Sequence, residues 1–274
     1  MTPALRFAAT SWTFLWRQPA LGRVAALLVF LPMLVMDVLD MRVGDTPAEQ
    51  AAVLVVLFIA AYALFTWGTA CTLVVGKRLL QAKAGRTRTS FKAVQGQARG
   101  FVAPLLLTDI LRACIALFWS LPAVGLGLFA MTELEITYLT SDPFDDARAY
   151  WYLAGMCLLL LLPLAYLALT VLAPQAVVYE KLSPRQALTR SRKLLWPRAG
   201  RSLGVLILLA LLWVPGMAAE ILIEDYVDPA VATFAVPVTI ALVDTVALML
   251  WTLSLTQYYK ALGGKAKAGA GESE

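Results

Sequence analysis

The sequence contains no histidine and only three cysteines among its 274 residues. Cys71, Cys114 and Cys157 each lie inside an apolar run, so no disulfide framework is evident. Without histidine, the chain lacks both the commonest general base and a usual zinc ligand. Most familiar catalytic constellations are therefore excluded, and we expect a non-enzymatic protein without a metal site or other cofactor.

Charge is also scarce, at 15% of the residues, whereas 60% are hydrophobic and the mean hydropathy is +0.74. An ordinary soluble domain has about 25% charged residues, so this composition is typical of a chain in a bilayer. A membrane span needs about 20 mainly apolar residues, because the hydrocarbon core is about 30 Å thick and a helix rises 1.5 Å per residue. Six stretches qualify, at 21–39, 51–75, 101–131, 151–174, 202–223 and 231–256.

Each of these spans is expected to be helical, since no water is present in hydrocarbon to satisfy unpaired backbone groups and no stretch alternates like a barrel strand. The sequence therefore predicts an all-α fold, a polytopic integral membrane bundle of six transmembrane helices. We expect residues 1–262 to form a single transmembrane domain. The tail at 263–274 is rich in Lys, Ala, Gly and Glu, which predicts disorder.

Basic residues gather on one predicted side of the membrane. Three lie in residues 1–23, seven in 76–100, seven in 180–201 and three in the C-terminal tail, which is 20 of the 23 in the chain. The loops on the other side hold eleven acids against only Arg42 and Arg148. Because cytoplasmic flanks collect Lys and Arg, we expect a multi-pass protein of the bacterial cytoplasmic (inner) membrane with both termini in the cytoplasm.

Two other readings of the basic residues are less favoured. A secretory signal peptide is not expected, because the first apolar run ends in Met36-Asp37-Val38-Leu39 without a small-x-small cleavage site. Nucleic acid is not an expected partner either, since the basic residues flank spans and do not lie on a soluble domain. Anionic membrane lipids are the expected partner, at about 1 kcal/mol per well-placed basic residue. Other membrane protein subunits are a second class of partner.

The segments before spans 1, 3 and 5 each have the pattern of a basic amphipathic helix at the membrane interface. Thr2-Pro3 starts the first, a weaker copy begins at about Ser90, and Ser183-Pro184 starts the third, where Gln186 completes a capping box. Apolar and polar side chains then separate onto opposite faces.

A possible internal repeat follows from these helices. Ser11, Leu15 and Trp16 match Ser191, Leu195 and Trp196 at a constant offset, which favours three units of interfacial helix, span, outer turn and span. The alternative is that basic interfacial segments occur in any polytopic protein.

Few ionisable groups fall within the spans, where each is expensive and is by default a functional candidate. Asp244 lies near the middle of the last span and could bind a cation, relay a proton or form a structural hydrogen bond. Asp109 and Arg112 are three residues apart and can pair within one helix, close to the cytoplasmic interface. The functional alternative joins these two to Asp244 in one electrostatic cluster.

The stretch from Glu180 to Leu194, EKLSPRQALTRSRKL, resembles a motif of a bacterial six-span membrane family. That family includes the membrane domain fused to some glycerophosphoryl diester phosphodiesterases and stand-alone proteins of unknown function. The closing Tyr258-Tyr259-Lys260 is similar to the end of the family's last span. The sequence differs at Lys181 and Ser183, where glycine is usual, and at Arg192, where an aromatic residue is usual. The resemblance implies a six-span topology but no phosphodiesterase activity.

Two functions are consistent with these observations. The first is a non-enzymatic lipid-associated scaffold or accessory subunit of a membrane complex, whose interfacial helices bind anionic headgroups. Its candidate headgroup contacts are Arg190, Arg192, Lys193, Arg198 and Arg201. The alternative is a transporter or channel for a small solute or ion that uses Asp244, since repeats are common in alternating-access proteins. An enzyme acting on lipids is a third and less favoured class.

Overall fold

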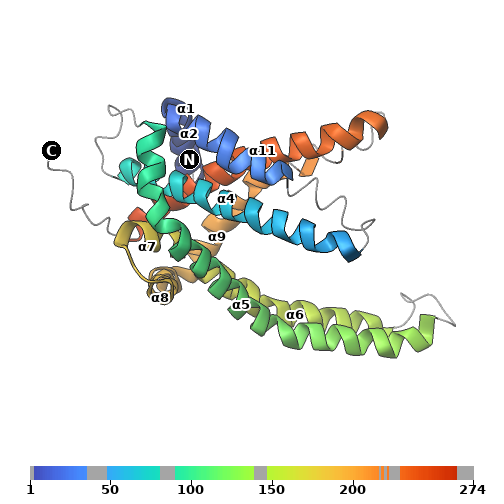
Figure 1. Cartoon of the computed structure of the whole chain (residues 1–274). Coiled ribbons are helices and arrows are strands. Elements are labelled where there is room, and N and C mark those ends of the chain that lie inside the picture. The colour runs from blue at the N-terminus through green and yellow to red at the C-terminus, as the bar shows by residue number, and fades with distance from the viewer. Residues whose placement is uncertain are drawn as a thin grey trace.

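Figure 1 shows the computed structural model of the chain, which describes residues 3–35, 48–80, 90–138, 147–215, 217–218, 221 and 229–263. Every regular element within these residues is a helix, which confirms the all-α bundle. Five helical segments are long and apolar enough to cross a membrane, or six if one bent pair counts as a single span. They are Leu54–Lys77, Phe91–Ala130, Tyr150–Glu180, Pro184–Trp213, Ala235–Ala261 and the bent pair of Pro3–Arg17 with Pro19–Val35.

Some sequence predictions cannot be compared with the structure. The outer end of the first predicted span and residues 264–274 of the predicted tail lie outside the described residues. The same holds for the side chains of the eleven acids predicted in the outer loops.

The chain begins with an elbow between α1 (Pro3–Arg17) and α2 (Pro19–Val24), which continues into the π-helical η1 (Ala25–Phe30). The two helical segments meet at an angle of 88°. Gln18 between them is extended, at φ −110° and ψ 99°, because a proline disfavours the helical conformation in the residue before it. Pro19 then starts the next helix at a position where its missing N–H costs nothing. The sequence thus places the bend at one dipeptide.

The second predicted interfacial helix is not a separate element. Helix α5 (Phe91–Tyr138) runs unbroken for 48 residues through Pro104 and Pro122. At 1.5 Å per residue it is about 72 Å long, more than twice the thickness of the hydrocarbon core. Ser90 caps its start by accepting the Ala93 N–H at 3.3 Å, as the sequence predicts. An internal proline bends a helix without having to end it, and α5 curves along its length (Figure 1).

Helix α5 lies beside α6 (Ala147–Leu169), and this pair extends away from the rest of the bundle (Figure 1). Both helices expose large apolar side chains along most of their length, such as Leu117, Phe118, Leu158 and Leu161. Only 17% of the apolar window of α5 is buried. This surface is what a lipid environment would cover.

The third predicted interfacial helix is α8 (Pro184–Leu195), which follows α7 (Ala173–Glu180). Its capping box is present, with the Ser183 N–H donating to Gln186 Oε1 at 3.2 Å. The helix tightens at η2 (Trp196–Arg198) and continues as α9 (Ala199–Ala210) and η3 (Leu211–Trp213). Its buried face consists of Ala187, Leu188, Ser191, Leu194 and Leu195.

Two helices complete the centre of the bundle, α4 (Ala48–Leu80) and α11 (Pro229–Ala261). Half of the apolar window of α11 is buried, the largest share among the candidate spans. The two helices meet α7 at Gly76, where a Cβ would lie 3.1 Å from Tyr179 Oη and 3.4 Å from Thr256 Oγ1. The Tyr179 and Thr256 hydroxyls also share a hydrogen bond of 2.8 Å. The missing side chain of Gly76 therefore allows three helices to converge.

The packing agrees with a repeat of three units. The helix that begins each predicted unit contacts the helix that ends another unit: α1 lies on α11, α5 on α4, and α8 on α7. The matching serines, Ser11 and Ser191, are both fully buried and both form a hydrogen bond to another helix. Ser191 Oγ donates to the Leu169 carbonyl at 2.8 Å, and Ser11 Oγ accepts from Gln257 Nε2 at 2.8 Å. The constant offset seen in the sequence thus corresponds to equivalent positions in the structure.

Candidate functional site

The elements that carry most of the described basic residues gather at one end of the bundle (Figure 1), whereas Arg112 lies further along α5. They are α1, α8, the last turns of α4 and α11, and the first turns of α5 and α9. Contacts of α1 with α11, of α7 with α8 and of α4 with α5 hold this end together. The described parts of the four basic segments, which are dispersed in the sequence, therefore lie at one end of the bundle, which we call the basic end.

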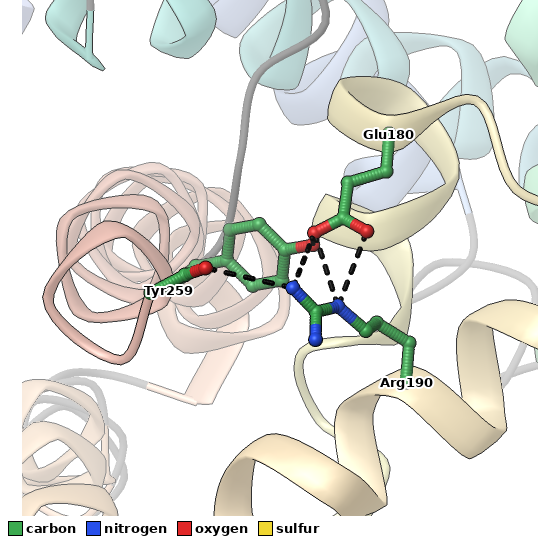
Figure 2. Close-up of polar contacts among 4 residues, drawn as sticks. Glu180, Arg190 and Tyr259 are labelled. Carbon is green, nitrogen blue, oxygen red and sulfur yellow. Dashed lines mark hydrogen bonds and ion pairs between the residues drawn. The ribbon is translucent and has the colours of Figure 1, made fainter.

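At this end, Glu180, Arg190 and Tyr259 form a polar cluster that joins α7, α8 and α11 (Figure 2). Arg190 Nε donates to both Glu180 carboxylate oxygens at 3.1 Å, and its Nη2 donates to Oε1 at 3.1 Å. The Tyr259 hydroxyl also donates to Glu180 Oε1. The exposed fractions are 31% for the Arg190 side chain, 13% for that of Glu180 and 0% for Tyr259. The cluster is therefore largely shielded from solvent.

The polar cluster changes the role assigned to Arg190. Arg190 Nη2 also lies 3.5 Å from the Gly263 carbonyl, so most of its donors face protein oxygens. A guanidinium held by a carboxylate in a two-point contact is already neutralised and oriented. Arg190 thus ties α8 to α7 and to the end of α11, and the structure gives it no outward face comparable to that of Arg192.

Directly after Glu180, the backbone turns at Lys181 with φ 54° and ψ 42°, the left-handed conformation. Glycine is favoured where a helix ends in this way, because other residues strain their Cβ against the backbone. Lysine here carries a local strain.

We expect Lys181→Gly to stabilise the protein by up to about 1 kcal/mol, because the relief of left-handed strain exceeds the added chain entropy of glycine. Ser183→Gly, two residues further along the chain, is the matched control. Ser183 is extended and caps α8, so its replacement is expected to cost a few tenths of a kcal/mol. Thermal unfolding in detergent measures both changes. Changes of the same sign would contradict the assignment of strain to Lys181.

The outward face of α8 presents three exposed cations, Arg185, Arg192 and Lys193. Within the described part of the chain, none of the three forms an ion pair. They line one side of a hollow of about 920 Å³, whose other walls come from α5 and α6; we call it the α8 groove. Its lining residues are Leu111, Ile115, Trp119, Leu162, Ala165, Tyr166, Leu169, Arg185, Leu188, Thr189, Arg192, Lys193, Trp196 and Pro197.

The other two candidate headgroup contacts lie elsewhere. Arg198 and Arg201 are exposed and border a smaller hollow of about 230 Å³, between α1, α9 and α11. This hollow is also lined by Tyr258, whose hydroxyl shares a 2.7 Å hydrogen bond with Ser202 Oγ. The five predicted contacts are thus divided among the α8 groove, the smaller hollow and the polar cluster.

The intramembrane candidates Asp109 and Arg112 lie on α5, with Tyr62 of α4 facing them. Asp109 interacts with Arg112, its partner three residues along the helix, as the sequence predicts. Asp244 does not join them among the interactions described for Asp109. Helix α4 contacts both α5 and α11 and so lies between the two sites. Within the described residues, Asp109 thus interacts electrostatically with Arg112 of its own helix and with Tyr62 of α4.

Asp244 lies on α11 and is partly exposed, one residue before the buried Thr245. Thr245 donates to the Ala241 carbonyl at 2.6 Å. Asp244 itself has an interaction, so its carboxylate is not an isolated charge. The transport hypothesis that depends on Asp244 stays a prediction.

Metal binding is not indicated by the described side chains, among which no three cysteines or carboxylates come together. In comparisons with protein families, with curated proteins and with solved structures, the chain has no match. The resemblance of the Glu180–Leu194 stretch therefore stays a prediction based on those residues alone.

Two parts of the site were not expected from the sequence. Glu180 is the single acid in the basic segment 180–201, and this isolation could have indicated an ion pair with one of the basic side chains. The helical periodicity of α8 could not show that Arg190 would face α7 and α11, because that orientation depends on how the helix packs against them. Arg185 belongs to the polar face of α8, but its place beside α5 depends on a packing that no local pattern encodes.

Proposed function

We propose that this chain is a non-enzymatic multi-span membrane protein that acts as a lipid-associated scaffold or as an accessory subunit of a membrane complex. It binds anionic lipid headgroups through the outward face of α8. The observation that carries this proposal is the division of that helix: five residues are buried, while Arg185, Arg192 and Lys193 point outward beside exposed apolar helices. A membrane interface likewise presents negatively charged headgroups next to hydrocarbon, which match the cations and the apolar helices respectively.

The location follows from the same charges. We propose that the basic end lies at the cytoplasmic face of a bacterial inner membrane, since Lys and Arg accumulate on cytoplasmic flanks. Both termini would then be cytoplasmic. The close approach of the two ends of the described chain supports a common side, because Pro3 and Leu262 border the same hollow.

The proposal is tested with the triple variant Arg185→Ala, Arg192→Ala, Lys193→Ala. Each well-placed basic residue contributes about 1 kcal/mol to binding of anionic lipid, so we expect affinity to fall on the order of 100-fold. The full chain is reconstituted and its affinity for phosphatidylglycerol is compared with that for phosphatidylcholine. Arg190 is retained in the variant because its loss would disturb the polar cluster.

A charge-matched control separates this site from general attraction. Arg6, Arg17 and Lys92 are three exposed cations of α1 and α5, and none of them borders the α8 groove. Their replacement by alanine removes the same net charge and is expected to lower affinity by less than tenfold. Equal losses in the two triple variants, or no loss in the first, would reject α8 as the headgroup site.

A further inference from the structure

The α8 groove has two chemically different parts. Its rim on α8 carries Arg185, Arg192 and Lys193, while its walls on α5 and α6 are apolar, with Leu111, Ile115 and Leu162 among them. A volume of about 920 Å³ is in the range of sites that hold a small molecule. Such a groove suits an elongated amphiphile with a negative head and a hydrocarbon chain. A soluble anion would leave the walls without a partner.

A second hollow extends the site. It measures about 400 Å³, and it shares Leu111 and Arg185 with the α8 groove. Its other lining residues on α5 are mainly apolar, including Leu107 and Ile110. Two hollows with apolar walls therefore meet at Leu111 and Arg185. This arrangement favours a ligand with one charged group and two chains.

Aromatic side chains mark the depth of the groove in the bilayer. Trp119 of α5, Tyr166 of α6 and Trp196 of η2 all border it. Tryptophan and tyrosine are enriched where headgroups meet hydrocarbon, because one part of each ring system is polar. Tyr166 shares the groove lining with Arg192, whose charge acts on the phenol. The groove thus passes from the headgroup level into the apolar region.

We propose that the α8 groove binds one two-chain anionic glycerophospholipid. The phosphate of the lipid lies among Arg185, Arg192 and Lys193. One acyl chain follows the wall formed by α5 and α6, and the other enters the second hollow. This inference rests on the proposed function and makes it specific, since a bound molecule of defined stoichiometry replaces a diffuse charged surface. The charge of the rim and the second hollow that adjoins the α8 groove at Leu111 and Arg185 are the observations that carry it.

Filling the groove tests this assignment while keeping every cation in place. Ala165→Trp on α6 and Thr189→Trp on α8 each place a large side chain in the groove from opposite walls. Both residues are exposed, so neither substitution overpacks the core. Ala154→Trp is the matched control, because Ala154 is exposed on the same helix as Ala165 but does not border the groove. Thermal unfolding checks that all three variants fold.

The delipidated full chain is titrated with dioleoyl phosphatidylglycerol and followed by native mass spectrometry. We expect one lipid to bind saturably to the wild type and to Ala154→Trp, with at least tenfold weaker binding by each groove-filling variant. Single-chain lysophosphatidylglycerol is expected to bind at least tenfold more weakly than the two-chain lipid. Unchanged binding in both filling variants, or equal binding of the lyso lipid, would overturn the groove assignment.

The two levels of the hypothesis fail differently. If filling the groove has no effect but the Arg185, Arg192 and Lys193 variant still loses affinity, the groove is rejected and the charged face remains. If the charge variant also binds phosphatidylglycerol as the wild type does, the proposed function itself is rejected.

Discussion

Gly68→Ala is expected to be among the most destabilising single substitutions in this protein. A Cβ at position 68 would lie 2.4 Å from the Leu28 carbonyl oxygen and 2.9 Å from its carbonyl carbon. Both atoms belong to the backbone of η1, so the clash cannot be relieved by a change of rotamer. We expect a loss of about 3 kcal/mol, of the order of 10 °C in Tm, measured by thermal unfolding in detergent.

The same substitution at other helical glycines provides the control. At Gly125 of α5 and Gly204 of α9, no atom lies within 4 Å of the place that a Cβ would take, and both residues lie in exposed helix. Alanine there is expected to change stability by no more than about 1 kcal/mol, in the stabilising direction, because alanine favours helix over glycine. A loss at Gly68 no larger than at Gly125 would show that η1 and α4 are not packed this closely.

Breaking the polar cluster is expected to have the second large effect. Glu180→Ala removes the acceptor of both Arg190 and Tyr259, and it leaves the fully buried Tyr259 hydroxyl without that bond. Hydrogen bonds to charged groups contribute about 1.5–3 kcal/mol each, so we expect a loss near 3 kcal/mol. Arg190→Ala keeps the tyrosine contact and is expected to cost about 2 kcal/mol.

A double-mutant cycle measures the coupling directly. The Glu180→Ala, Arg190→Ala double variant is expected to lose at least 1 kcal/mol less than the sum of the single losses, because the two side chains share one interaction. Arg192→Ala is the matched control, since it removes an exposed arginine from the same helix. Its loss is expected to stay within about 0.5 kcal/mol. Additive losses in the cycle would show that the contact contributes nothing to stability.

The polar cluster also bears on the proposed binding of lipid. Arg190 orients α8 on α7 and α11, and the three groove cations project from the same helix. An arginine that was grouped with the headgroup contacts by sequence thus differs in role from its neighbours two and three residues away. The three side chains are alike in type, and only the docking of α8 separates them.

Several features of the fold could be read from the sequence because they depend on local chemistry. Composition and run length predict the spans, since hydrocarbon excludes charge and requires helix. Ser183 with Gln186 predicts the start of α8. The predicted separation of an interfacial helix from the third span is wrong, because α5 continues through Pro104 without ending there.

Other features depend on which elements meet. Gly76 gives no sign in the sequence that it borders Tyr179 and Thr256, and Gly68 gives none that it borders η1. Asp109, Arg112 and Asp244 were candidates for one cluster, yet the interactions described for Asp109 are with Arg112 and Tyr62. Distances between helices far apart in the chain are set by side-chain packing, which no periodicity records.

By itself, the sequence determined the apolar segments long enough to cross a membrane, the helical class, the segregation of the basic residues and the matching positions of Ser11 and Ser191. These follow from transfer of apolar surface and from backbone hydrogen bonding, which act on each segment separately. Only the tertiary structure decided which arginine pairs with Glu180, which cations border the α8 groove, and that a second hollow adjoins this groove. Those outcomes depend on contacts between helices, and such contacts exist only when the whole bundle has assembled.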